Sequence, residues 1–521
     1  MTTLASVFYA QTPHLLWQHC LGGAKNDGAS TIINAPNGGF IFLGTTWSSN
    51  SGDVSGFHLS PSTSNGDAWF AKLSASGGLE YQQCFGSNSY EQGEGIISTT
   101  DNGYAFLANT GLKKDSLNGD ISGAHGDYDF WFVKLNSDFS IKWQRCFGGS
   151  LSDEPSAFKQ TLDGGYILAG SSKSSDGDVT GNLGYNNCWV IKTDSIGFIE
   201  WQKIYPKGAG GFLTAVVATS DKGYLITGNT NFDPLKYGTA ASKSDAFVIK
   251  LDSMGNILWE QPLAGNNEDY VTTSIEDNRG DYVIAGLTMS TDSPFYAHPV
   301  THASWVEKLD HSGNLKWMKA YGGELDDHVF SIIQTSDNGY AFTGQTSSAY
   351  EGIPNAGGRD LWVVKLDQNG TMQWQKLLGG SGEDNGQSII QTTNGDYIVA
   401  GFTGSNNNDG VVSGFQGGNT DAWVVRLGMS SSVEWNGTLQ YHQRIYPNPA
   451  STEIFIASVE GSTPFRIMDL LGRVVRSGMV GDHTDISIDV SDLPMGIYFV
   501  FVDDLRDGHP VLVGKAAIMG R

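Results

Sequence analysis

The sequence has few charged residues, and basic residues are the scarcest of them. Charged side chains make up 17% of the 521 residues, and 31 basic residues stand against 55 acidic ones, so the formal net charge is -24. A surface this acidic repels nucleic acids and anionic membranes, so we expect no nucleic-acid partner. No apolar run reaches the roughly 18 residues of a membrane-spanning helix, so we expect no transmembrane segment.

The four cysteines do not form a disulfide pattern. Cys20, Cys84 and Cys146 occupy the same place in successive repeats, and Cys188 precedes a repeated tryptophan. Equivalent positions in neighbouring repeats are usually too far apart to be bridged. We therefore expect small, buried hydrophobic side chains at these positions.

Helical periodicity and common catalytic motifs are also absent. We find no Gly-x-Ser-x-Gly, no phosphate-binding glycine loop and no reactive cysteine pair. His298 and His302 have the spacing of a helical zinc-binding pair, but Pro299 between them is incompatible with a regular helix and no Glu follows His298. The sequence therefore predicts no catalytic residue and does not favour an enzyme.

One sequence motif, which we call the repeated phrase, recurs throughout the first 430 residues. It reads Asp-x-Trp-Val-x-Lys-Leu, then a glycine turn, then Trp-Gln, as in Asp360–Leu366 followed by Trp374-Gln375. The second aromatic residue of the phrase recurs at intervals of about 60 residues, at Trp17, Tyr81, Trp143, Trp201, Trp259, Trp317 and Trp374. Repeats of this length indicate one supersecondary unit per repeat.

Each repeat contains four short apolar segments of strand length, bounded by Gly, Asn and Asp. Tight hairpins join the first segment to the second and the third to the fourth, as at Asp101-Asn102-Gly103. Meanders of this kind without helices predict an all-β fold, a seven-bladed β-propeller with four-stranded blades. A β-solenoid is the alternative, but its repeats are shorter.

The first three segments occur seven times, whereas the fourth is missing from the last repeat and present alone near the N-terminus, around Trp17. We expect this N-terminal strand to complete the last blade and close the ring, with the segment around Trp435 as the competing candidate. Residues 14–428 are then the propeller and 429–444 a linker. Residues 1–13 are interpreted as the remnant of a signal peptide, or alternatively as a disordered leader.

We letter the four strands of each repeat A to D in chain order. The B–C connections within a repeat and the D–A connections between repeats vary in sequence, so the face of the ring that carries them is the candidate binding face. A pair of acidic residues stands at the start of the first strand in several blades. These pairs predict a ring of ligand-binding carboxylates, and the alternative is that the acids only cap the amides of loops. Loop tyrosines are candidates for stacking on sugar rings. These predicted residues are Asp153, Glu154, Glu268, Asp269, Asp326, Asp327, Glu383, Asp384, Tyr128, Tyr185, Tyr296 and Tyr350.

Three B–C connections share a Gly-Asp-x-x-Gly motif, and their aspartates, Asp53, Asp120 and Asp178, are weak candidates for calcium ligands. None shows the full alternating series of aspartates, and Asp-Gly is also ordinary turn chemistry. No cofactor is established by the sequence, and calcium is the one candidate.

The final 77 residues do not match the repeat and alternate as a small Ig-like β-sandwich. Three ordered motifs lie in residues 445–521, and their key residues are Tyr446, Pro447, Asn448, Pro449, Asp469, Gly472, Leu493, Pro494, Gly496 and Tyr498. This region resembles the type A C-terminal sorting domain of the type IX secretion system. The resemblance implies a bacterium of the Bacteroidota, recognition by that secretion machinery, and passage through the periplasm to the outer-membrane surface or the medium.

These observations favour a secreted or cell-surface propeller that binds an extracellular glycan or protein, in an adhesion role. Two other functions stay open. One is a polysaccharide-active hydrolase or lyase that uses acidic and aromatic residues of the loop face. The other is a purely structural surface scaffold.

Overall fold

The computed structural model describes residues 12–36, 38–59, 65–112, 119–207, 210–231, 244–292, 302–349, 355–428, 445–446, 452–456, 463–468, 474–480, 486–494, 496–503 and 510–518. It divides into two compact units, Met1–Ser430 and Ser431–Arg521. Within these residues every regular element is a β-strand, and none forms a helix long and apolar enough to cross a membrane.

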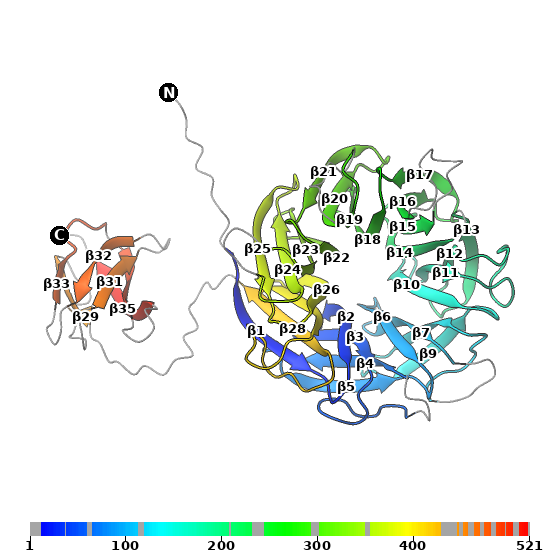
Figure 1. Cartoon of the computed structure of the whole chain (residues 1–521), viewed down its shortest axis with the longest axis horizontal. Helices are drawn as coiled ribbons and strands as arrows, with labels where there is room; N and C mark the ends of the chain where they lie inside the picture. Colours follow the sequence, from blue (N-terminus) through cyan, green and yellow to red (C-terminus); the bar gives the residue numbers. More distant parts are fainter. Residues whose placement is uncertain are drawn as a thin grey trace. The chain divides into compact units, whose positions relative to one another are not determined.

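The first unit is a ring of seven four-stranded antiparallel sheets, which confirms the predicted propeller (Figure 1). The innermost strands are β2 (Asp27–Asn34), β6 (Glu91–Ser98), β10 (Asp153–Gln160), β14 (Gly211–Ala218), β18 (Asp269–Glu276), β22 (Asp327–Gln334) and β26 (Asp384–Gln391). The second strands are β3 (Phe40–Thr46), β7 (Tyr104–Thr110), β11 (Tyr166–Ser172), β15 (Tyr224–Asn231), β19 (Tyr282–Thr288), β23 (Tyr340–Thr346) and β27 (Tyr397–Thr403). The blades are numbered 1 to 7 in this order.

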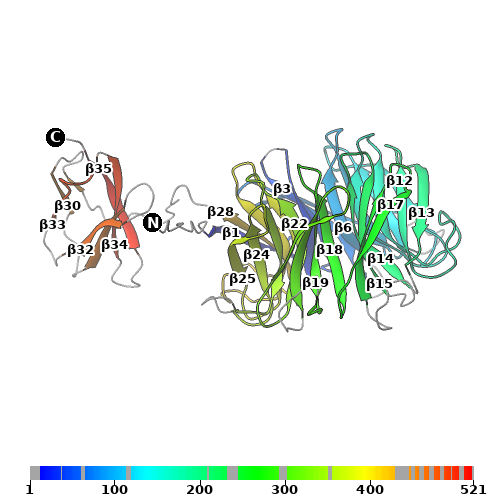
Figure 2. The same ribbon diagram turned by 90° about the horizontal axis from the view of Figure 1, so that it is seen from above.

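The third strands are β4 (Asp67–Leu73), β8 (Asp129–Leu135), β12 (Asn187–Thr193), β16 (Ser244–Leu251), β20 (Ala303–Leu309), β24 (Asp360–Leu366) and β28 (Asp421–Gly428). The outer strands are β5 (Leu79–Phe85), β9 (Ile141–Phe147), β13 (Ile199–Tyr205), β17 (Ile257–Leu263), β21 (Leu315–Tyr321), β25 (Met372–Leu378) and, in blade 7, β1 (His14–Leu21). Seen edge-on, the connections project from the two ends of the sheets (Figure 2).

Strand β1 closes the ring, as the sequence predicts. It pairs antiparallel with β28, with Leu15 opposite Leu427 and Cys20 opposite Trp423. The indole Nε1 of Trp423 donates to Gln18 Oε1 at 2.7 Å, so the first and last strands of the propeller also share a side-chain hydrogen bond. Trp435, the competing candidate, lies outside the described residues.

The core of each blade is built on the third strand. Its tryptophan is fully buried in six blades, at Trp69, Trp131, Trp189, Trp305, Trp362 and Trp423, and the four cysteines are buried as well. In five blades the buried indole donates to the Oε1 of a glutamine on the outer strand, for example Trp131 to Gln144 at 3.0 Å. The repeated Trp and Gln therefore hold the third and outer strands together.

The end of the ring that carries the two hairpin turns is pinned by ion pairs. In blades 2 to 6 the lysine near the end of the third strand reaches the aspartate of the A–B turn in its own blade. Examples are Lys134 to Asp101 at 2.9 Å and Lys308 to Asp277 at 2.7 Å, and Arg426 binds Asp396 in blade 7. Blade 1 differs, because Lys72 pairs with Glu80 instead. These cations are used by the scaffold, which leaves the opposite end as the candidate functional face.

The second unit consists of two sheets around one core. Strands β29 (Ile445–Tyr446), β30 (Glu453–Ile456) and β33 (Ile486–Asp489) form the first sheet. The second contains β32 (Val474–Val480), β31 (Thr463–Met468), β34 (Gly496–Asp503) and β35 (Pro510–Ile518). Buried residues of both sheets, among them Ile454, Ile467 and Val500, form a single cluster, as in a β-sandwich.

Deleting residues 1–21 should destabilise the propeller far more than deleting residues 1–12. The longer deletion removes β1, leaves β28 as an unpaired edge and uncovers the indole of Trp423. We expect the melting temperature to fall by about 10 °C or more and the protein to associate. Thermal unfolding and size-exclusion chromatography measure both effects, and equal melting temperatures for the two deletions would contradict closure by β1.

Candidate functional site

A regular set of backbone hydrogen bonds organises the end of the ring that carries the B–C and D–A connections, which we call the mouth. The first residue of an inner strand donates its N–H to the carbonyl of the residue just before the third strand of the preceding blade. Examples are Asp153 to Tyr128 at 2.8 Å, Asp327 to His302 at 3.2 Å and Asp384 to Arg359 at 2.6 Å. The backbone geometry therefore repeats, while the side chains at these positions differ from blade to blade.

The two members of each predicted acidic pair have different environments in the structure. Asp153, Asp269, Asp327 and Asp384, each the first residue of an inner strand, are fully buried. Asp384 accepts the Gly380 N–H at 2.8 Å, the Ser405 hydroxyl at 2.7 Å and the Thr403 hydroxyl, and so ties the D–A turn to the B–C connection. These four carboxylates cap loop amides and hydroxyls, which is the structural alternative weighed from the sequence.

The same place in blades 1 and 2 is taken by Asp27 and Glu91. Glu91 accepts from Ser87 and Thr110 as the aspartates do from their hydroxyl partners. Glu94 lies three residues further along β6. The other members of the pairs, Glu154, Glu268, Asp326 and Glu383, reach the surface of the mouth.

A second set of buried carboxylates was not predicted as a site, although Asp opens the repeated phrase. In most blades the first or second residue of the third strand is an aspartate. This aspartate lies against the acid that opens the inner strand of the following blade. One oxygen of Asp67, Asp129, Asp360 and Asp421 has no hydrogen-bond partner among the described residues. Burial, followed by the charges of Asp27 and Asp53, raises the pKa of Asp421 to about 7.

The aspartates of the Gly-Asp-x-x-Gly motif lie against the D–A turns. Asp53 exchanges two hydrogen bonds with the backbone of Gly22, its N–H donating at 2.7 Å and its Oδ2 accepting at 3.3 Å. Asp120 and Asp178 do the same with Gly86 and Gly148. In the part of the chain that the structure describes, no group of three or more His, Cys, Asp or Glu is arranged to hold a metal ion.

Three aromatic side chains lie next to one another at the mouth over blades 1 and 2, with the ring planes of Trp47 and Tyr90 inclined by 37° and those of Tyr90 and Tyr128 by 86°. The ring centroids of Trp47 and Tyr90 are 6.2 Å apart, and those of Tyr90 and Tyr128 are 6.4 Å apart. We call Trp47, Tyr90 and Tyr128 the aromatic row. Only Tyr128 was predicted from the sequence, because Trp47 and Tyr90 become its neighbours only when adjacent blades pack.

Carboxylates with different environments stand beside the aromatic row. Burial and then the charge of Glu154 raise the pKa of the Glu94 carboxyl to about 8, and burial followed by Glu94 raises the pKa of Tyr90 to about 12. Glu154 is exposed, and it accepts the Ser152 hydroxyl at 2.9 Å. Tyr90 also donates to Gln92 Oε1 at 2.5 Å.

Over blades 5 to 7 the mouth carries alternating basic and acidic side chains. Nδ1 of His302 lies 3.0 Å from Asp326 Oδ1, and the Arg359 guanidinium lies 3.9 Å from Asp326 and 4.0 Å from Glu383. Burial, with the nearby charges of His302 and Arg359, lowers the pKa of His328 to about 4. Blades 1 and 2 also place a histidine against carboxylates, with His58 2.8 Å from Asp67 and His125 3.9 Å from Asp129. Sequence reasoning missed the cluster of blades 5 to 7 apart from Asp326 and Glu383.

The remaining predicted residues are more isolated. Glu268 accepts a hydrogen bond from the Tyr270 hydroxyl at 2.8 Å, and Tyr185 is 63% exposed. Tyr296 and Tyr350 lie outside the described residues. Of the sorting-domain residues, Tyr498 is buried and donates to the carbonyl of Pro494 at 2.8 Å, while Pro447, Asn448, Pro449, Asp469 and Gly472 are also outside the described residues.

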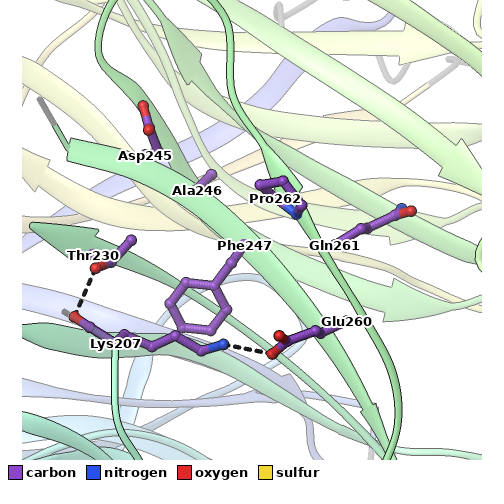
Figure 3. A pocket seen from close by; sticks show the side chains of 8 residues that line it. All are labelled: Lys207, Thr230, Asp245, Ala246, Phe247, Glu260, Gln261 and Pro262. Atoms are coloured by element: carbon purple, nitrogen blue, oxygen red, sulfur yellow. Dashed lines mark hydrogen bonds and ion pairs between the residues drawn. The ribbon is translucent and has the colours of Figure 1, made fainter. Parts of the chain in front are cut away.

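The junction of blades 3 and 4 lacks both of the buried carboxylates found at other junctions. Asn187 replaces the aspartate of the third strand, and Gly211 replaces the acid of the inner strand. Lys207 lies there instead, with Nζ 2.7 Å from Glu260 and 5.0 Å from the centre of the Phe247 ring (Figure 3). Its carbonyl accepts the Thr230 hydroxyl at 2.8 Å. These contacts tie the D–A connection to blade 4, so this small pocket is part of the scaffold.

The buried carboxylates predict a stability maximum on the acid side of neutrality. The native state binds protons at Asp421, Asp129 and Asp360, whose pKa values burial raises to about 7, 6 and 6, and the unfolded chain releases those protons at lower pH. Stability should therefore rise as the pH falls from 8 to about 5.

Further acidification should reverse this trend. Against the cost of burial, hydrogen bonds from Thr99 and Lys134 hold the pKa of Asp101 well below its ordinary value, so protonating it removes a native ion pair. Melting temperatures between pH 3 and 8.5 test both limbs. Asp421→Asn should flatten the limb between pH 5 and 8, Asp101→Asn only the acid limb, and an unchanged profile in Asp421→Asn would contradict the assignment.

Comparison with known structures yields low similarities. Sqt1 from Chaetomium thermophilum is 12% identical over 80% of this chain and 100% of its own, with a TM-score of 0.41. An apocarotenoid oxygenase from Synechocystis is 10% identical, covering 92% and 98%, with a TM-score of 0.37. PorZ, an essential surface component of the type IX secretion system of Porphyromonas gingivalis, is 10% identical, covering 96% and 100%, with a TM-score of 0.15. These values support no inference about function.

No curated protein matches the chain. Residues 444–508, however, match the family described as the secretion system C-terminal sorting domain, which confirms the resemblance seen in the motifs around Tyr446 and Leu493. A domain of this family directs a protein to the cell surface or the medium through the secretion machinery that recognises it. The second unit of this chain thus belongs to the C-terminal sorting domains of the type IX secretion system, and the propeller is what it exports.

Proposed function

We propose that the exported propeller is a binding module for an extracellular glycan and that the aromatic row forms the floor of its site. Trp47, Tyr90 and Tyr128 follow one another at the mouth with ring centroids 6.2 and 6.4 Å apart. Sugar rings present apolar C–H faces that pack on aromatic rings, and hydroxyl groups that need polar partners. Gln92 is such a partner, since it accepts a hydrogen bond from the Tyr90 hydroxyl, and Glu154 is an exposed carboxylate of the neighbouring blade.

A comparison of equivalent positions favours binding over a purely structural role. The residue just before the third strand is Tyr128, His302 or Arg359 in different blades, although its carbonyl makes the same hydrogen bond in each. A scaffold needs only the backbone contact, and a site needs particular side chains. The single observation that carries the proposal is the aromatic row, which occurs once in the described part of the ring.

Replacing either tyrosine of the row should weaken glycan binding. The full-length chain is screened on a glycan array, and the strongest ligand is then titrated by calorimetry. We expect Tyr90→Ala and Tyr128→Ala each to reduce affinity by about tenfold, as truncation of an aromatic hot spot does.

Tyr185→Ala is the matched control, because Tyr185 is also an exposed tyrosine of a B–C connection and lies outside the row. Unchanged affinity in both row variants would contradict the proposed site. Binding of an extracellular protein with the same dependence on Tyr90 and Tyr128 would keep the site and overturn the ligand class.

A second candidate function is cleavage of the bound glycan, which one observation favours. Glu94 and Glu154 are neighbouring carboxylates in different environments, and a carboxyl group with a pKa near 8 is protonated at neutral pH. Glycoside hydrolases pair such a general acid with a second carboxylate that acts as nucleophile or base. Glu94 would protonate the glycosidic oxygen, and Glu154 would act as the nucleophile or base on the other side of the bond.

If this second function holds, Glu94→Gln should abolish turnover without loss of binding. The production of reducing ends from a panel of polysaccharides is measured for the wild type, Glu94→Gln and Glu154→Gln. Loss of a general acid is expected to lower the rate by about 100-fold or more. Glu268→Gln, at the mouth of another blade, is the control, and turnover that persists in both variants would exclude this mechanism.

A further inference from the structure

Two histidines and one carboxylate meet at the junction of blades 5 and 6. His302 stands just before β20, Asp326 just before β22, and His328 is the second residue of β22. The rings of His302 and His328 have centroids 5.6 Å apart and planes inclined by 66°. Two imidazoles at this separation can direct one nitrogen each at a common ion.

The ring nitrogens of His302 are distinguished by their surroundings. Nδ1 lies 3.0 Å from Asp326 Oδ1, so the carboxylate fixes the orientation of the ring and favours a proton on Nδ1. Nε2 is then the nitrogen with a free lone pair. A carboxylate behind an imidazole is the arrangement that orients and strengthens a metal-binding histidine.

His328 supplies the second nitrogen. Its Nε2 is buried and has no hydrogen-bond partner among the described residues. A buried polar atom of this kind calls for a partner that the described protein atoms do not provide, such as an ordered water or an ion. The ring also lies beside Phe330, with centroids 6.1 Å apart, which limits its rotation.

We propose that His302 and His328 bind a divalent transition-metal ion of the zinc or copper type through their Nε2 atoms. Imidazole is a preferred ligand for these ions, and water or an oxygen of a bound molecule completes the coordination. Asp326 orients His302 and is not itself a ligand. The site has two protein ligands, which agrees with the absence of any three-residue metal cluster from the described ranges.

The charges around the site are of both signs, since those of His302 and Arg359 oppose a positive charge at His328 and that of Asp326 favours one. Arg359 carries a fixed positive charge close by, and it lies between Asp326 at 3.9 Å and Glu383 at 4.0 Å. Those two carboxylates outnumber it, and the chain as a whole carries a formal charge of -24. This metal site stands apart from the aromatic row over blades 1 and 2 and does not depend on the proposed glycan binding.

Calorimetric titration of the full-length chain with zinc sulfate at pH 7.5 tests the proposal. We expect one saturable site that His302→Ala and His328→Gln each weaken at least about tenfold. Asp326→Asn should weaken binding by about 10- to 100-fold through the orientation of His302 alone. Cobalt substitution supplies a second readout, because its visible absorption reports the ligand set.

His311→Ala is the matched control, since it removes a histidine of the same blade from the C–D turn at the opposite end of the ring. Its zinc affinity should equal that of the wild type. All variants are checked for an unchanged melting temperature without metal, so that loss of binding is not loss of fold. The absence of a saturable zinc site, or wild-type affinity in both His302→Ala and His328→Gln, would overturn the proposal.

Discussion

The propeller depends on the buried carboxylate that opens each inner strand. In blade 1, Asp27 accepts the Gly23 N–H at 2.7 Å and the Ser48 hydroxyl at 2.8 Å, and so joins the end of the outer strand, the start of the inner strand and the B–C connection. Burying a charge is costly unless it is fully hydrogen-bonded. The hydrogen bonds offset part of that cost, since burial still raises the pKa of Asp27 and raises that of Asp269 to about 6. They recur with an acid in six of the seven blades. Gly211 takes the place in blade 4, where Lys207 makes different contacts.

Because these buried groups hold the backbone, the side chains beside them are free to differ. The mouth therefore has a backbone that repeats from blade to blade and side chains that do not. The aromatic row lies over blades 1 and 2, and the cluster of His302, Asp326 and Arg359 lies over blades 5 to 7. The opposite end carries the same Lys–Asp pair in five of the seven blades. Function is usually found where a rigid frame presents variable loops, and only one end of this ring does so.

The two units serve different purposes within one chain. The sorting domain has a core of its own, with Phe465, Ile488 and Tyr498 among its buried residues, and its family membership explains export without reference to the propeller. The propeller contributes whatever activity is delivered outside the cell. Its acidity suits neutral or cationic partners, such as the glycan proposed for the aromatic row and the metal ion proposed for the two histidines.

The sequence by itself determined the strands, the turns, the seven blades and the closing strand around Trp17. These follow from period-two alternation and from glycine turns, which are local features, and from a missing fourth strand that ring closure must supply. It also determined the sorting domain, because those motifs are contiguous. The folded structure was needed to show which acid of each pair is buried, that Glu91 takes the buried place in blade 2, and that Tyr90 contacts both Trp47 and Tyr128. The reason is physical. Neighbours across a junction come from different blades, and burial and pKa depend on everything packed around a group, which no local pattern records.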